Sequence, residues 1–129
     1  MNDLQKYFQG AHVYIWPEKF AIIKAKQTVK EAFVNIIDQD EITVMIDQNK
    51  LDHVDVIEAE KDWRIFTLDV VFPMNVFGVT ATIATALTKE KISIMPIAAY
   101  SRDHFLIKDK DVVRASDVFT KFGMNVIKK

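Results

Sequence analysis

The segment from Pro73 to Gly78 contains residue types that can bind a small anion. Pro73 ends an apolar run, and Gly78 stands near the start of a helix expected over Phe77–Lys89. The first amides of a helix lack partners within the helix and lie at the positive end of its dipole, so they suit a carboxylate. Gly78 would let a ligand approach the backbone, although a glycine also suits close packing of a helix on a sheet. We therefore expect Val76, Phe77 and Gly78 to surround the anionic group of a ligand.

Three polar residues could complete such a site. The Asn75 amide can donate to and accept from a ligand, or it can cap the helix. Asp103 could pair with a ligand ammonium or simply form the turn between two strands. Arg102 could hold a carboxylate through two hydrogen bonds or remain solvated.

The wall opposite this segment is expected from the next strand and the turn that follows it. Met95 and Ile97 on the strand could line an apolar side-chain pocket or belong to the core. Tyr100 begins the turn that ends at Asp103 and would bring polar atoms to the same rim. The expected ligand-binding residues are therefore Asn75, Val76, Phe77, Gly78, Met95, Ile97, Tyr100, Arg102 and Asp103.

The composition disfavours several other kinds of chemistry. The 129 residues carry a net charge of -1 with no long basic stripe, which argues against a nucleic-acid partner. The chain has no cysteine, and His12, His53 and His104 lie on separate elements, so we expect no metal and no cofactor. An acylphosphatase-like hydrolase would need an arginine in the loop Phe72–Gly78, which has none. We expect no catalytic residues.

The second half of the chain predicts the order β-α-β-β-α-β. Pro96 would confine its strand to a sheet edge, because proline cannot donate a hydrogen bond to the ladder. Asp109 is expected to cap the second helix and Gly123 to end it. The expected elements are strands over Trp63–Phe72, Ile92–Ala99, His104–Ile107 and Met124–Ile127 and helices over Phe77–Lys89 and Lys110–Phe122.

The first half is predicted to be a shortened version of the same order. Thr28 and Glu31 have the spacing of a capping box before a short helix over Lys30–Ile37. The remaining expected elements are strands over His12–Trp16, Phe20–Ala25 and Ile42–Ile46, a helical turn over Asn49–Leu51 and a weaker strand near Val54–Ala59. The fold class is α+β, with units over residues 1–62 and 63–129 whose antiparallel sheets are backed by helices.

The second half resembles the ACT family. The resemblance rests on the run Ile92–Ile107, with Tyr100 and Asp103 in its turn, and on the helix starts within Val76–Ile83 and Lys108–Ala115. Thinner matches in the first half are Pro17–Ile23 and Asp40–Val44, so the resemblance covers roughly residues 14 to 122. The chain is similar to small bacterial tandem ACT proteins, which are related to the ACT pairs of the cytosolic arginine sensor and of aspartate kinase regulatory domains. It departs from them at Pro73-Met74, where relatives often carry Asp-Phe, and at Lys89-Glu-Lys91, where they often have a glycine.

This resemblance implies a ferredoxin-like ACT fold and a regulatory sensor that binds a small molecule, with an amino acid as the expected ligand, between its two units. The departure at Pro73-Met74 leaves an alternative open, a protein-interaction module whose ligand pocket has degenerated. A pocket filled by Met74 or Phe77 would favour this alternative. Edge strands and apolar surface favour a homodimer, with Tyr7, Phe8, Tyr14 and Trp16 as candidate interface residues. The polar start over Met1–Gly10 and the lack of an apolar run of about 20 residues favour a cytoplasmic protein with no membrane partner.

Overall fold

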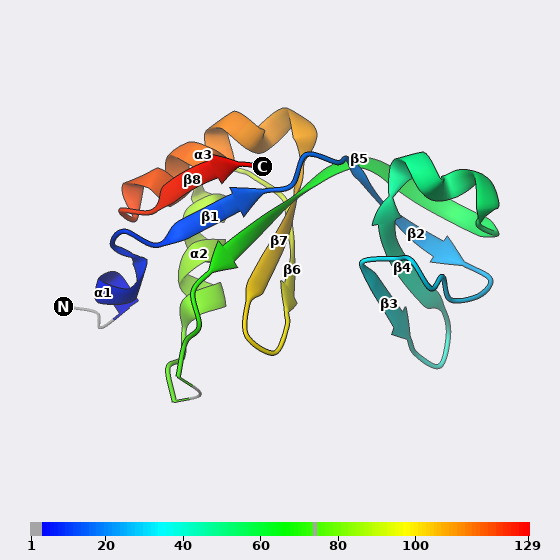
Figure 1. Ribbon diagram of the computed structural model, residues 1–129, viewed down its shortest axis with the longest axis horizontal. Coiled ribbons are helices and arrows are strands. Elements are labelled where there is room, and N and C mark those ends of the chain that lie inside the picture. Colours follow the sequence, from blue (N-terminus) through cyan, green and yellow to red (C-terminus); the bar gives the residue numbers. More distant parts are fainter. Residues whose placement is uncertain (1–3, 74) are drawn as a thin grey trace. The chain divides into compact units, whose positions relative to one another are not determined.

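The computed structural model describes residues 4–73 and 75–129, which form two compact units (Figure 1). The larger unit contains the residues up to Pro17 together with Arg64–Lys129, and the smaller unit contains Glu18–Trp63. The division after Trp63 lies within one residue of the expected boundary at 62/63. The residues before Glu18, expected in the first unit, belong instead with the second half of the chain.

The larger unit contains the expected order β-α-β-β-α-β, preceded in the sequence by a short helix and a strand. Within its sheet the strand order is β8-β1-β5-β7-β6, with β1 parallel to β8 and antiparallel to β5. Its elements are α1 (Leu4–Phe8), β1 (His12–Ile15), the part of β5 (Val56–Asp69) from Arg64 onward, α2 (Val79–Lys89), β6 (Ile94–Ala98), β7 (Asp103–Lys108), the 3-10 helix η2 (Asp109–Asp111), α3 (Val112–Lys121) and β8 (Asn125–Lys128).

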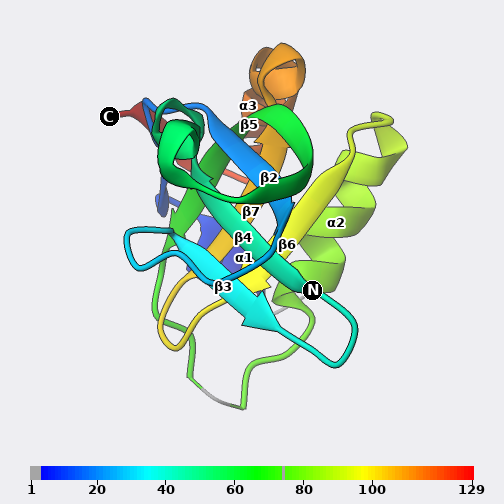
Figure 2. The same cartoon turned by 90° about the vertical axis from the view of Figure 1, so that its right-hand side faces the viewer.

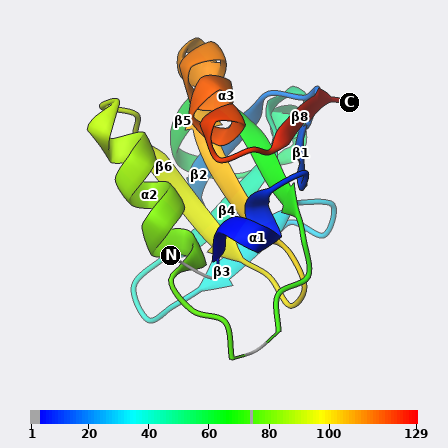
Figure 3. The ribbon, with the colours of Figure 1, turned by 90° about the vertical axis from the view of Figure 1, so that its left-hand side faces the viewer.

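Helices α2 and α3 cover one face of this sheet, as expected (Figure 3). Alternate residues of the strands point toward the helices, and the Phe66 and Phe119 rings stack with centroids 5.5 Å apart. The buried core on this face includes Val13, Ile15, Phe66, Leu68, Ile83, Leu87, Phe105, Ile107, Ala115 and Phe119. Because this core joins both helices to β1, β5 and β7, it fixes the start of α2 relative to β7.

The edge position of β6 confirms the prediction from Pro96. Within the described part of the chain β6 pairs with β7 alone, from Ile94 opposite Ile107 to Ala98 opposite Asp103. Pro96 stands opposite Phe105. Because no second strand of the described residues pairs with β6, the missing N–H of Pro96 interrupts no hydrogen bonds on the outer side of this strand.

The two ends of α3 differ in how well they were predicted. Gly123, with φ of 89°, ends the helix as expected, and its N–H donates to Thr120 O while Met124 N–H donates to Phe119 O. The expected Asp109 cap is wrong, because the helix begins at Val112 after the turn η2. Asp109 instead accepts a hydrogen bond from Arg64 at 3.2 Å.

The smaller unit contains strands and one 3-10 helix, in the order β3-β4-β2-β5 across its sheet (Figure 2). Its elements are β2 (Phe20–Ala25), β3 (Val34–Ile37), β4 (Ile42–Asp47), η1 (Gln48–His53) and the part of β5 before Arg64. The helix expected over Lys30–Ile37 is wrong, since Val34–Ile37 is a strand paired with β4. The Asn35 side chain closes the loop before β3 by accepting from Val29 N–H at 2.8 Å and donating to Val29 O at 2.9 Å.

The short helix α1 packs into the core of the larger unit. Leu4 and Phe8 are 4% and 1% exposed, and the Phe8 ring lies 5.3 Å from Phe122 and 6.3 Å from Phe72. Gln5 also donates to Phe122 O at 3.1 Å. Phe8 is therefore a core residue and not part of the dimer interface for which it was a candidate.

Candidate ligand-binding site

A pocket of about 390 Å³ lies where the chain leaves β5 and enters α2. All of its lining residues belong to the larger unit. They are Phe72, Pro73, Val76, Phe77, Gly78, Val79, Thr80, Ala81 and Asp103. Of the nine residues expected from the sequence, the structure brings Val76, Phe77, Gly78 and Asp103 into this pocket.

The start of α2 differs from the expectation in a way that affects this pocket. The helix begins at Val79 and not at Phe77, because Gly78 adopts the left-handed conformation with φ of 86°. The first turn closes with Thr82 N–H donating to Gly78 O at 2.9 Å. Gly78 offers no side chain to cap the amides of the first turn that follows it. The residues of the first turn of α2 therefore line the pocket while no side chain caps their amides.

The loop before α2 does not fill the pocket with Phe77. This ring is 88% exposed, although its residue lines the rim. A turn in which Val76 N–H donates to Pro73 O at 2.9 Å precedes it. Met74, the other residue that could occupy the pocket, lies outside the described residues.

Asp103 places a carboxyl group in the same pocket. Asp103 is two residues before Phe105 and four before Ile107 along β7, so its side chain lies on the same face as these buried residues. This is the face that α2 covers. Burial raises the pKa of Asp103 above its usual value, and the neighbouring His104 lowers it by a smaller amount. A ligand ammonium would supply the positive charge that this desolvated carboxylate lacks.

The other expected site residues lie elsewhere. Met95 and Ile97 alternate with Ile94 on β6, so they point to the sheet face opposite the helices. Tyr100 is fully exposed, and Asn75 is exposed beside the pocket without being part of its lining. Met95, Ile97 and Tyr100 therefore do not form the opposing wall that the sequence predicted.

Arg102 takes part in a polar cluster on the helix-free face. Its Nε donates to Asp69 Oδ1 at 2.6 Å, and this bond, together with one from Tyr14, holds the pKa of Asp69 below its usual value. On the same face Trp16 Nε1 donates to Thr67 Oγ1 at 2.8 Å. Arg102 and Asp103 are neighbours in sequence, but they serve opposite faces of the sheet.

Five lining residues were not predicted: Phe72, Pro73, Val79, Thr80 and Ala81. Phe72 and Pro73 follow the last paired residue of β5, and the other three form the first turn of α2. The sequence signal that could have identified them was the glycine itself, because a left-handed residue before a helix moves the helix start beyond it.

Residues 4–73 and 75–129 contain no group of three or more histidine or acidic side chains placed to hold a metal ion. None of the described helices is long and apolar enough to cross a membrane.

Comparison with known proteins gives a family match and several similar structures. A family model described as an ACT domain matches residues 58–121. A protein from Agrobacterium tumefaciens is similar over 93% of this chain and 94% of its own, with a TM-score of 0.76 and 16% identity. No match was found among curated proteins.

Two aspartate kinase structures are also similar. The enzyme from Clostridium acetobutylicum, described as allosteric, has a TM-score of 0.68 and 16% identity over 86% of this chain and 34% of its own. The ligand-free regulatory subunit of aspartate kinase from Thermus thermophilus has a TM-score of 0.57 and 11% identity over 84% of this chain and 95% of its own. At these identities the similarity shows the fold.

Proposed function

Because this chain is an ACT-domain protein, we propose that it is a regulatory binding module, not an enzyme, whose ligand is a free amino acid. The observation that supports this proposal is the pairing of two opposite features in one pocket. The uncapped amides at the start of α2 suit a carboxylate, and Asp103 suits an ammonium. A free amino acid carries both groups on its α-carbon.

The larger unit supplies every residue named for this site. We therefore propose that the ligand is held within this unit, at the start of α2. Regulation would follow if ligand binding changes the loop Phe72–Gly78, which includes the exposed Phe77 ring. The cytoplasmic location expected from the sequence is part of the same proposal.

A thermal-shift screen against the free amino acids tests the proposed function. A ligand at one hundred times its dissociation constant stabilises a protein by about 2.7 kcal/mol, which for a chain of this length raises Tm by roughly 10 °C. We expect such a shift from one amino acid or a small group of related ones. If no amino acid changes Tm at millimolar concentration, the amino-acid proposal is wrong and the exposed Phe77 would favour a protein-interaction module.

Changing Asp103 to asparagine should separate ligand affinity from stability. We expect the affinity for the amino acid to fall by about tenfold to a hundredfold, since a hydrogen bond to a charged group is lost. Tm of the ligand-free protein should stay equal or rise at neutral pH, because the folded-state pKa of Asp103 lies above its unfolded value. The ionised Asp103 carboxylate therefore destabilises the folded protein. This unfavourable effect disappears as pH falls through the raised pKa, because the carboxyl group becomes protonated.

The pH dependence of binding gives a second readout of Asp103. The wild-type affinity should fall as pH decreases through the raised pKa of this carboxyl, because the protonated form cannot pair with an ammonium. The Asp103→Asn variant should have a flat profile over the same range, and the exposed Asp117→Asn variant should behave as the wild type. A pH profile that Asp103→Asn leaves unchanged would rule out this role.

We also propose that the protein forms a homodimer. The strand β3 lies at an edge of its sheet and exposes Ile36 and Ile37, which are 42% and 70% accessible. Light scattering at tens of micromolar protein should give twice the monomer mass, and Ile37→Lys should restore the monomer. A monomeric wild type at that concentration would exclude the dimer.

A further inference from the structure

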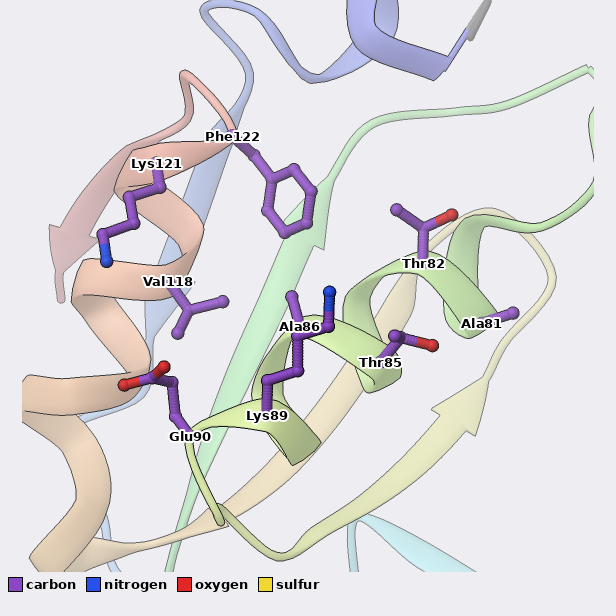
Figure 4. A pocket seen from close by; sticks show the side chains of 9 residues that line it. All are labelled: Ala81, Thr82, Thr85, Ala86, Lys89, Glu90, Val118, Lys121 and Phe122. Carbon is purple, nitrogen blue, oxygen red and sulfur yellow. The ribbon is translucent and has the colours of Figure 1, made fainter.

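A second pocket lies between the two helices of the larger unit and shares only Ala81 with the pocket at the start of α2 (Figure 4). Its volume is about 570 Å³, within the range of roughly 300–1,000 Å³ typical of small-molecule sites. Helix α2 contributes one side and the end of α3 contributes the other. We call this pocket the interhelical groove.

The groove is open because α2 presents small side chains to it. Ala81, Thr82, Thr85 and Ala86 line it at positions one turn apart, while the larger Ile83 and Leu87 of the same helix are buried in the core. On the other side Val118 and Phe122 provide apolar surface. The Phe122 ring is held from behind by Phe8, 5.3 Å away, so this wall is fixed.

The charge at the rim is positive. Lys89 is the last residue of α2, Lys121 is the last residue of α3, and Glu90 is the single acidic residue of the lining. Figure 4 places the two lysines on opposite sides of the groove. In Figure 4 the Lys121 ammonium is turned away from Lys89, so an anionic group above the apolar floor meets both ammonium groups once the exposed Lys121 side chain rotates toward the groove.

These lysines are not needed to complete the helix ends. Arg114 already donates to Glu90 O at the end of α2. The backbone amides of Gly123 and Met124 already satisfy the carbonyls of Thr120 and Phe119 at the end of α3. The ammonium groups of Lys89 and Lys121 thus remain available to a ligand.

We propose that the interhelical groove binds a small carboxylate with an apolar body, of the size of a medium-chain fatty acid. The apolar body would lie against Ala86, Val118 and Phe122, and the carboxylate would lie between Lys89 and Lys121. This site shares only Ala81 with the pocket at the start of α2, and none of the residues proposed to contact the fatty acid lines that pocket, so either site can fail without the other.

NMR titration of the whole chain with octanoate tests the proposal, with octan-1-ol as the neutral probe of equal chain length. Octanoate should shift the backbone amides of residues 82–90 and 118–122, and octan-1-ol should bind there several-fold more weakly. The double variant Lys89→Gln/Lys121→Gln should weaken octanoate binding by about tenfold, since each exposed ion pair is worth up to about fivefold in affinity. It should leave octan-1-ol binding unchanged, and Lys110→Gln, outside the groove, should leave both unchanged.

A matched pair of threonine variants tests the location. Thr85 lines the groove and Thr88 does not, and both are exposed residues of α2. Thr85→Leu should cover the floor and weaken octanoate binding at least tenfold, whereas Thr88→Leu should bind as the wild type, with circular dichroism verifying the fold of each. Equal binding of both probes, amide shifts outside the groove, or unchanged binding by Thr85→Leu would overturn the proposal. Shifts of the groove amides with protein concentration alone would assign the groove to a second copy and overturn it as well.

Discussion

Replacing Phe8 with alanine is expected to lower the free energy of unfolding by about 3–5 kcal/mol, the usual cost of removing a fully buried phenylalanine. The ring is 1% exposed and contacts both Phe72 and Phe122, so its loss leaves a cavity between α1 and the helix layer. Urea unfolding followed by circular dichroism measures this change directly. Because Phe72 lines the pocket at the start of α2, we also expect weaker amino-acid binding.

The control for this variant is Phe77→Ala, which removes the same side chain from an exposed position. Phe77 is 88% accessible, so its removal should change the free energy of unfolding by less than about 0.5 kcal/mol. If both alanine variants unfold at the same urea concentration, the packing of α1 against the core is not as described.

Replacing Gly78 with valine should both destabilise the protein and abolish amino-acid binding. A helical glycine would tolerate valine at modest cost, but Gly78 has φ of 86°, a conformation that a branched residue adopts only with strain of about 1–3 kcal/mol. An added Cβ would lie 3.9 Å from Leu4 Cδ1, an ordinary contact, so the strain comes from the backbone and not from a clash. The measurements are thermal unfolding and calorimetric titration with the amino acid found by screening.

Gly10→Val is the matched control. Gly10 also has a positive φ, 77°, and a Cβ there would meet nothing within 4 Å. This variant should show a comparable loss of stability with wild-type affinity for the amino acid, because Gly10 does not line the pocket. Unchanged affinity in folded Gly78→Val protein would place the ligand elsewhere.

The elements of the larger unit could be predicted because their local signals agree with their packing. The helix face Val79, Ile83 and Leu87 is buried as its spacing indicates, and Pro96 and Gly123 occupy the positions that their backbone restrictions favour. The strand β5 was divided into two in the sequence, since its first half is exposed and shows no clear alternation.

The error at residues 30–37 has a physical cause. Thr28 and Glu31 match a capping box, but a capping box stabilises only a helix that also buries one face. The run Val34–Ile37 is β-branched at three of four positions, which favours a strand. Pairing with β4 supplies its backbone hydrogen bonds instead. The bond between Asn35 and Val29 depends on a loop closure that no local pattern indicates.

The site was only partly predictable for a different reason. Val76, Phe77 and Gly78 are consecutive and precede a helix, so local chemistry identified them. Whether Met95 and Ile97 face the pocket depends on a period of two along β6, where a shift of one residue exchanges the faces. The sequence of an edge strand containing Pro96 did not fix that register.

The pairing of β1 with β8 has a consequence for the order in which the chain can fold during its synthesis. The smaller unit is continuous, from Glu18 to Trp63, and all its strand partners leave the ribosome together. The larger unit instead pairs β1 with β8, placing His12 beside Asn125, so one of its first strands lacks a neighbour until nearly the whole chain has emerged. Contacts between such distant residues form slowly. Nascent chains that end before β8 should therefore expose one edge of β1, which makes this strand the part of the protein most in need of a chaperone.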